Sequence, residues 1–233
     1  MKGILLAGGP GSRLSPLTDV TNKHLLPVGN VPMIYWPLRS MKRMGIRDIM
    51  VVTGREHAGD VFQLLGSGNQ LGLGLIYRVQ DESDGIVGAL RLAANFSRTD
   101  NICVFLGDNI FTCDIECSPF NKIILTRSSE AQRIGVVEIK NGKIIKIVEK
   151  PRCPKTNLVQ TGCYFYDRNV WDVISNIKKS ARGQYEISEL NELIVRYSSM
   201  SYDIISNKHW CDAGTPDSYV RANEMVRKIK CVF

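Results

Sequence analysis

Near the start of the chain, Gly3-Ile4-Leu5-Leu6-Ala7 is followed at once by Gly8-Gly9-Pro10-Gly11-Ser12-Arg13-Leu14. The first five residues form an apolar run with the length of a buried strand. The glycines after it let the backbone approach a ligand closely, so that several N–H groups can point at one anion. The stretch predicts a first β-strand that ends in a phosphate-binding loop; a glycine-rich turn without a ligand is the alternative.

The first half of the chain alternates between short apolar runs and helical patterns. The runs predict strands at 3–7, 49–53, 73–79 and 102–106, and the patterns predict helices at 33–44, 58–65 and 86–94. We expect these strands to be buried on both faces and mostly parallel, with right-handed crossovers. In such a sheet the ligand site lies beyond the carboxyl ends of the strands, so the chemistry should follow the first and fourth strands.

The second half has a different pattern. Residues 135–140 and 143–149 are rich in β-formers and flank Asn141-Gly142, a strong signal for a two-residue hairpin. Further strands are predicted at 160–166 and 202–205, and helices at 170–177, 187–197 and 216–228. The whole pattern predicts a Rossmann-like three-layer α/β/α fold, with a mixed, mostly parallel central sheet and a small antiparallel hairpin section. A chain of 233 residues fits a single domain, 1–233.

Composition and charge restrict the class of protein only broadly. The 44% hydrophobic and 23% charged residues are ordinary for a globular protein, and no apolar run approaches the roughly 20 residues of a membrane span. We therefore expect no membrane association. The net charge of +7 fits a phosphate-rich ligand or a solvated basic face. Because the basic residues are scattered, we expect no nucleic-acid partner.

Cysteines and histidines give no metal or disulfide pattern. The seven cysteines are odd in number and irregularly spaced, which favours a reducing cytoplasm as the location. His24, His57 and His209 lie far apart and lack the spacing of metal ligands, so each is read as a surface or packing residue.

Two cations follow the glycine loop, and they could neutralise a triphosphate. Arg13 stands in the loop itself and Lys23 in Lys23-His24-Leu25-Leu26-Pro27. The pattern L-A-G-G-x-G-[ST]-R-L followed by K-x-L-L-P resembles the sugar-1-phosphate nucleotidyltransferase family, most of all its glucose-1-phosphate thymidylyltransferase group in a short form. Further segments resemble the family in the same order through nearly the whole chain.

The resemblance implies an enzyme that transfers a nucleotidyl group from a nucleoside triphosphate to a sugar 1-phosphate and releases pyrophosphate. It implies dTTP and glucose 1-phosphate as substrates, Mg²⁺ as cofactor, and a nucleotide-binding half of about 1–110 with a sugar-phosphate-binding half of about 111–233. Members of the family are usually dimeric or tetrameric, so a homo-oligomer is compatible with it.

The resemblance also implies roles for individual residues. Arg13 would stabilise the leaving pyrophosphate and Lys23 the attacked phosphorus, while Asp108 in Leu106-Gly107-Asp108-Asn109 and Asp212 in Trp210-Cys211-Asp212-Ala213-Gly214-Thr215 would hold the metal. A turn or helix-cap role is the alternative for Asp108. The nucleotide would contact Leu6, Ala7, Gly8, Gly9, Gly11, Ser12, Arg13, Gln80, Asp84, Gly85 and Asp108. The sugar phosphate would contact Asn109, Gly135, Glu149, Lys150, Gln160, Tyr164 and Trp210.

One departure from the family bears on the base. Ile86-Val87-Gly88-Ala89 stands where thymidylyltransferases usually have L-A-Q-A, so UTP or CTP, and another phosphorylated or phosphonate acceptor, stay open. The segment Arg182-Gly183-x-x-Glu186 resembles a family motif that opens a helix and is read as mostly structural. A non-catalytic sugar-nucleotide-binding subunit is a second alternative. A nicotinamide-dependent oxidoreductase is disfavoured because Leu14 replaces the third glycine of a dinucleotide fingerprint.

Overall fold

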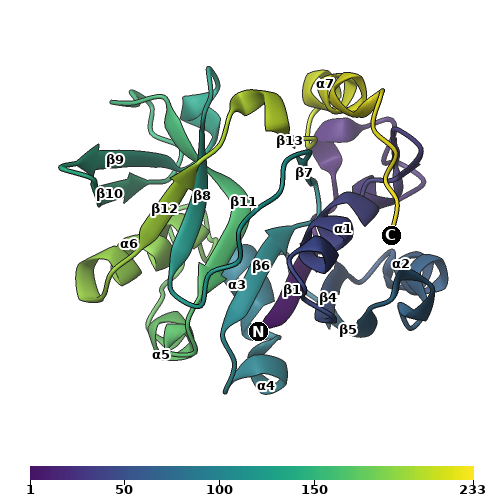
Figure 1. Ribbon diagram of the computed structural model, residues 1–233, viewed down its shortest axis with the longest axis horizontal. Coiled ribbons are helices and arrows are strands. Elements are labelled where there is room, and N and C mark those ends of the chain that lie inside the picture. Colours follow the sequence, from purple (N-terminus) through teal and green to yellow (C-terminus); the bar gives the residue numbers. More distant parts are fainter.

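The computed structural model describes residues 1–233, and its first half is a parallel sheet. The strands β6 (Ile102–Leu106), β1 (Lys2–Ala7), β4 (Asp48–Gly54) and β5 (Gly74–Gln80) lie side by side in that order (Figure 1). All three of their pairings are parallel. The carboxyl ends of β1 and β6 are therefore neighbours, which places the glycine loop next to Asp108.

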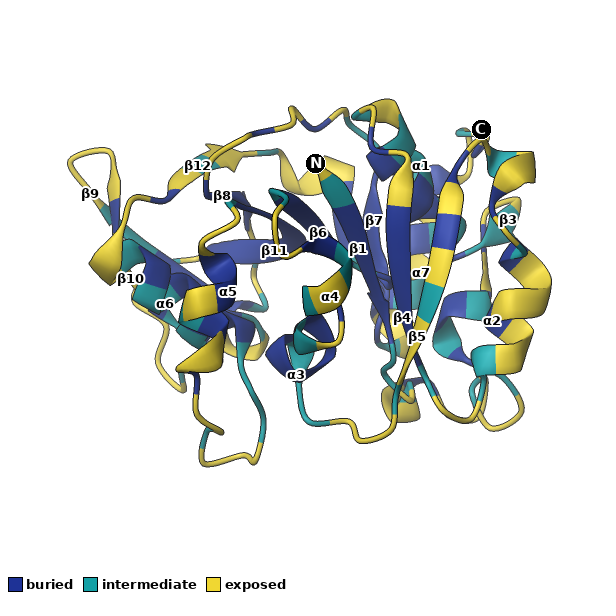
Figure 2. Cartoon of the chain, turned by 90° about the horizontal axis from the view of Figure 1, so that it is seen from below, coloured by how far each residue is buried: buried dark blue, intermediate teal, exposed yellow.

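Helices cover both faces of this sheet because the side chains of β1 alternate between two cores. Leu5 and Ala7 pack with α1 (Tyr35–Arg43) and α2 (Ala58–Leu65). Ile4 and Leu6 pack on the other face with α3 (Ile86–Arg91) and with helices of the second half. Figure 2 shows the central strands as the buried layer between these helices. The three-layer α/β/α arrangement predicted from the alternating pattern is confirmed.

The second half continues the same sheet through β11 (Leu158–Tyr166), which runs antiparallel to β6. β11 also pairs antiparallel with β8 (Lys122–Arg127) and β9 (Val136–Lys140), so the antiparallel section extends beyond the predicted hairpin of β9 and β10 (Lys143–Val148). β12 (Ser201–Ile204) lies parallel to β8. Two helices of this half are α5 (Val170–Ser175) and α6 (Ile187–Tyr197), whereas α4 (Ala94–Ser97) precedes β6 in the first half.

A separate two-stranded sheet positions the second aspartate. β7 (Asn109–Phe111) pairs antiparallel with β13 (Trp210–Asp212), and the register sets Asp212 opposite Asn109. The next residue, Ala213, donates its N–H to the carbonyl of Asp108. α7 (Pro216–Val226) then starts at Thr215, whose side chain caps it in a capping box with Ser218. The short strands β2 (Pro27–Val28) and β3 (Val31–Pro32) form a further hairpin.

Most predicted elements are present, and two expectations are wrong. The strand predicted at 73–79 is not buried on both faces: β5 is the edge of the sheet, and Ile76 and Val79 are 43% and 40% exposed. The helix predicted at 86–94 breaks, because α3 ends at Arg91 and α4 begins at Ala94. β7, β8 and β13 were not predicted. No helix has the length and apolarity that crossing a bilayer requires.

Candidate active site

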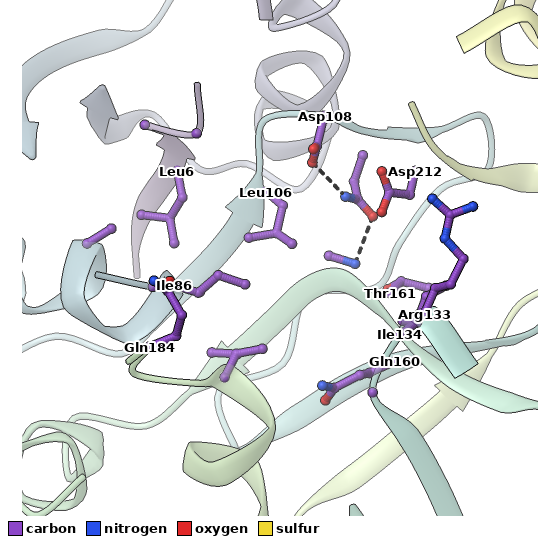
Figure 3. Close-up of a pocket in the computed structure, with 18 of the residues that line it drawn as sticks. Leu6, Ile86, Leu106, Asp108, Arg133, Ile134, Gln160, Thr161, Gln184 and Asp212 are labelled. Carbon is purple, nitrogen blue, oxygen red and sulfur yellow. Dashed lines mark hydrogen bonds between the residues drawn. The ribbon is translucent and has the colours of Figure 1, made fainter. Parts of the chain in front are cut away.

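A cleft of about 340 Å³ lies where the two halves of the sheet meet. Its wall is made from the glycine loop, the carboxyl end of β6, the loop before α3, and residues of β11, β13 and α6 (Figure 3). The predicted site residues in its lining are Leu6, Gly8, Gly9, Arg13, Lys23, Gln80, Gly85, Asp108, Asn109, Gly135, Glu149, Lys150, Gln160, Tyr164, Trp210 and Asp212. The fold thus brings most of the predicted residues to one place.

Four predicted residues lie outside this lining. Ala7 is fully buried in the core, and Ser12 begins a short 3₁₀ turn, Ser12–Leu14, that carries Arg13. Gly11 has φ of 75°, and a Cβ there would lie 2.9 Å from the Cβ of Lys23, so a glycine lets the loop and Lys23 pack together. These residues shape the loop. Asp84 also lies outside the lining and turns toward Gln80.

Lys23 and Asp108 form a buried ion pair at the centre of the cleft. Lys23 Nζ donates to Asp108 Oδ2, and the two side chains are only 11% and 10% exposed. Burial raises the pKa of Asp108, but the Lys23 ammonium, together with the hydrogen bonds that Lys23 and Asn109 donate, brings the pKa below its ordinary value. Lys23 also lies against Gly9, so the same ammonium faces both the phosphate loop and the carboxylate.

The two predicted metal ligands converge on one point. A Cβ placed on Gly214 would lie 2.8 Å from Asp212 Oδ1 and 3.4 Å from Asp108 Oδ2, with Arg13 Nη2 at 2.9 Å. Burial and then the Asp108 charge raise the pKa of Asp212, as expected for two crowded carboxylates. Figure 3 shows both carboxylates directed into the same part of the cleft. Two carboxylate ligands, with remaining positions left to water and phosphate, fit Mg²⁺.

Asn109 holds this arrangement in place. Its Oδ1 accepts hydrogen bonds from Gly162 N at 2.9 Å and from Trp210 Nε1 at 2.7 Å, and its Nδ2 donates to Asp108 Oδ1 at 3.0 Å. The side-chain oxygen and one amide hydrogen are therefore engaged within the protein, and the residue is 2% exposed. Its main role in the structure is to orient Asp108 and to tie β7 to β11 and β13.

The opposite end of the cleft carries a connected polar network. Ser188 Oγ donates to Glu149 Oε2 at 2.5 Å and accepts from Gln160 Nε2, while Asn191 Nδ2 donates to Gln160 Oε1 at 2.8 Å. A Cβ on Gly135 would lie 2.2 Å from Gln160 Nε2, so only glycine fits beside this network. The network fixes the Glu149 carboxylate at the cleft wall.

Two cations accompany Glu149. Lys150 Nζ lies 3.4 Å from Glu149 Oε1, and Lys150 has φ of 41°, a left-handed conformation that is uncommon outside glycine. Arg182 Nη2 lies 3.5 Å from Glu149 Oε1 and 2.8 Å from Glu186 Oε1. The cleft therefore has cations at both ends, Arg13 and Lys23 at the glycine loop and Lys150 beside Glu149, which suits a ligand with phosphate at two places.

Comparison with known proteins agrees with this geometry. A family model described as nucleotidyl transferase matches residues 2–229. The chain belongs to the nucleotidyl transferase family. It is a nucleotidyltransferase whose sequence is 38% identical, over 240 residues, to the glucose-1-phosphate thymidylyltransferase of Mycolicibacterium smegmatis, with 99% of this chain and 83% of that protein covered. The corresponding Neisseria meningitidis enzyme is 38% identical over 241 residues, covering 99% and 84%.

Solved structures show the same relationship. The nucleotidyltransferase superposes with a TM-score of 0.93 and 46% identity on a Bacillus anthracis protein assigned as a glucose-1-phosphate thymidylyltransferase and crystallised with sucrose. The alignment covers 99% of this chain and 96% of that one. A UDP-glucose pyrophosphorylase complexed with UDP-glucose matches with a TM-score of 0.84 at 18% identity, covering 98% and 99%, which shows the shared fold.

Several cleft residues of this nucleotidyltransferase had no predicted role in the site. They are Pro10, His24, Ser83, Ile86, Ala89, Leu106, Arg133, Ile134, Thr161, Gly162, Gln184 and Ile187. Thr161 and Gly162 lie between the predicted residues Gln160 and Tyr164, and Arg133 lies two residues before the predicted Gly135, so the neighbours of predicted residues in the sequence would have included all three. Gln184 offers no sequence signal, because its place depends on a hydrogen bond from its Nε2 to Ser83 O, from the other half of the chain.

His24 is buried in the wall beside the ion pair. Its backbone N and its ring Nδ1 both approach Asn22 Oδ1, at 2.9 and 2.6 Å, so Nδ1 carries the proton. Burial, followed by the Lys23 charge, lowers the pKa of His24 to about 3. The reading of His24 as a packing residue holds, since a Cβ on Gly107 would meet its ring at 2.7 Å.

Proposed function

We propose that this nucleotidyltransferase makes a nucleoside diphosphate sugar from dTTP and glucose 1-phosphate. The observation that carries the proposal is the division of one cleft into a glycine loop with Arg13 and Lys23 at one end and Glu149 with Lys150 at the other. This arrangement suits a triphosphate in the first half of the chain and a sugar phosphate in the second. The names of the relatives support the same two substrates.

The reaction needs positioning and charge neutralisation more than acid–base chemistry. An oxygen of the sugar phosphate attacks the α-phosphorus, the bond from that phosphorus to the bridging oxygen breaks, and pyrophosphate leaves with the electron pair. A phosphate nucleophile is already ionised at neutral pH, so no general base is required. Lys23 neutralises charge at the α-phosphoryl group, Arg13 neutralises the leaving pyrophosphate, and Lys150 holds the attacking phosphate.

Asp108 and Asp212 would hold Mg²⁺, and the ion would supply neutralisation of charge between the phosphates. The Lys23 ammonium pairs with Asp108. Lys23 also lies against the glycine loop, so its ammonium would be placed to neutralise phosphate there as well as the Asp108 carboxylate. The odd, irregularly spaced cysteines support the cytoplasm as the location of the reaction.

Pyrophosphate release tests the proposal directly. Purified protein with Mg²⁺ is given each nucleoside triphosphate in turn, with glucose 1-phosphate, other sugar 1-phosphates and a phosphonate as acceptors. We expect release with dTTP and glucose 1-phosphate, a fall of at least about 100-fold in Asp108→Ala, and full activity in Asp81→Ala, an exposed aspartate outside the cleft.

Two outcomes would contradict the proposal. Release that needs UTP or CTP, or another acceptor, would keep the reaction and replace the substrates. Nucleotide binding without release for any pair would favour the non-catalytic subunit.

A further inference from the structure

The loop that precedes α3 contains an unusual packing arrangement around Gly88. A Cβ placed on Gly88 would lie 2.0 Å from Asp84 Oδ1 and 2.4 Å from its carboxyl carbon. Gly88 lies inside α3 and is buried, so its backbone would accept alanine. The missing side chain therefore makes the space that the Asp84 carboxylate fills.

From this position, the Asp84 carboxylate fixes the orientation of the Gln80 side-chain amide. Gln80 Nε2 donates to Asp84 Oδ1 at 2.8 Å and lies 3.4 Å from the carbonyl oxygen of Gly85. A carboxylate and a carbonyl accept hydrogen bonds and do not donate them. If the amide were reversed, its oxygen would face two acceptors. The orientation of the Gln80 amide is thus set by the chemistry of its neighbours.

The other end of that amide is open to the ligand. Gln80 Oε1 lies against Gly8, where a Cβ would be 2.8 Å away. No protein group donates a hydrogen bond to Oε1. Every buried side-chain oxygen in the protein has a partner, so Oε1 is not buried. Since Gln80 and Gly8 both line the cleft, Oε1 is open to it. Asp84 does not line the cleft.

The loop itself is held by the second half of the chain. Tyr185 N donates to Asp84 O at 2.8 Å, and Gln184 Nε2 donates to Ser83 O at 3.0 Å. Gly85 has φ of 108°, and a Cβ there would lie 2.6 Å from Tyr185 O. Figure 3 shows Gln184 and Ile86 at this end of the cleft. With its backbone tied at these points, the loop keeps Asp84 beside Gln80.

We propose that Asp84 is a positioning residue that sets base selectivity through Gln80, and that Gly88 makes this possible. With Oε1 directed at the ligand, Gln80 accepts from an N–H on the base edge. Thymine and uracil offer N3–H at that point, whereas cytosine presents the lone pair of its N3 to the same oxygen. The site therefore selects an imide base over cytosine. This inference rests on the proposed function, since it assigns the base of the triphosphate.

Two variants test in different ways whether Asp84 positions Gln80. Asp84→Asn keeps the shape but can pair with either orientation of the Gln80 amide, and Gly88→Ala keeps Asp84 but displaces its carboxylate. Asp81→Asn removes an exposed charge from the same loop, and Gly59→Ala fills a helix position with nothing within 4 Å. The dissociation constants of dTTP and dCTP are measured by calorimetry without acceptor, together with kcat/KM for both and the melting temperature.

We expect the wild type to favour dTTP over dCTP by at least about tenfold, and both test variants to lower this ratio about fivefold or more. The two controls should keep the wild-type ratio. A ratio that stays at the wild-type value in both variants overturns the proposal, as does an equal loss of affinity for both nucleotides. Absence of turnover with intact selectivity in the binding measurement would instead count against the proposed function.

Discussion

The ammonium of Lys23 donates a hydrogen bond to the carboxylate of Asp108, although the two residues are 85 positions apart in the sequence. Lys23 follows the glycine loop after β1, and Asp108 follows β6, which pairs directly with β1. The contact therefore arises from neighbouring parallel strands whose carboxyl ends meet. It also joins a cation that faces the phosphate loop to one of the two carboxylates that suit a metal.

Replacing Lys23 by methionine keeps the length of the side chain and removes its charge. Because Asp108 and Asp212 would remain buried without the ammonium, we expect the free energy of unfolding to fall by about 3 kcal/mol. We expect kcat/KM to fall by about 10²- to 10³-fold. Thermal unfolding with EDTA and with Mg²⁺ should show a larger stabilisation by the ion than in the wild type. Activity within about threefold of wild type would contradict a role for Lys23 in the reaction.

Replacing Asp212 by asparagine should raise the stability of the protein without metal and lower its activity. The raised pKa of Asp212 means that its charged form is disfavoured in the folded protein. The charge therefore reduces stability at neutral pH, and this penalty is lost as the pH falls from the folded pKa to the ordinary value of 3.8. Asparagine can still accept the hydrogen bond from Gly214 N. We expect the melting temperature in EDTA to rise by about 2–4 °C. We also expect loss of stabilisation by Mg²⁺ and at least about 100-fold lower activity.

A melting temperature below that of the wild type in EDTA would show that Asp212 stabilises the ligand-free fold. Asp217→Asn, at an exposed position in the first turn of α7, is the matched control and should change neither the stabilisation by Mg²⁺ nor the activity.

His24 should make the protein less stable in mild acid. Its pKa is about 3 in the folded protein, against an ordinary value of 6.5, so between these values the unfolded chain binds more protons. Stability therefore falls as pH decreases through this window, by up to about 1.4 kcal/mol per pH unit. Urea unfolding between about pH 7 and about pH 5 should show a shallower decrease in His24→Gln than in the wild type. Asp108 does not contribute here, because its lowered pKa affects stability only below its ordinary value of 3.8. Parallel pH curves for the two proteins would contradict the assignment.

Lys150 combines an unfavourable backbone conformation with a position beside Glu149. Lys150→Gly should keep the free energy of unfolding or raise it by about 1 kcal/mol, because glycine adopts positive φ without strain. The KM for glucose 1-phosphate should rise about tenfold or more, since the cation is lost. Asn141→Gly, at φ of 50° in the β9–β10 hairpin, is the control and should leave the KM for glucose 1-phosphate unchanged. An unchanged KM for glucose 1-phosphate in Lys150→Gly would remove Lys150 from that role.

Local sequence patterns predicted several helices and one hairpin with good accuracy. The predicted helices at 58–65 and 187–197 match α2 and α6, and the hairpin at Asn141-Gly142 joins β9 and β10. Periodicity and turn residues suffice here because each signal lies within a few consecutive residues. β8 was missed because Lys122 and Arg127 bound its apolar centre, and only the fold shows that Lys122 is buried against Asp203.

The sequence by itself determined the glycine loop, the cations Arg13 and Lys23, and the aspartates Asp108 and Asp212 as candidates, because short motifs fix which groups are available. Only the tertiary structure decided how these groups meet. The β7–β13 pairing sets Asp212 beside Asp108, and the space over Gly88 turns Asp84 toward Gln80. Such contacts depend on strand register and on the volume left by a missing side chain, and neither is encoded in any single stretch of residues.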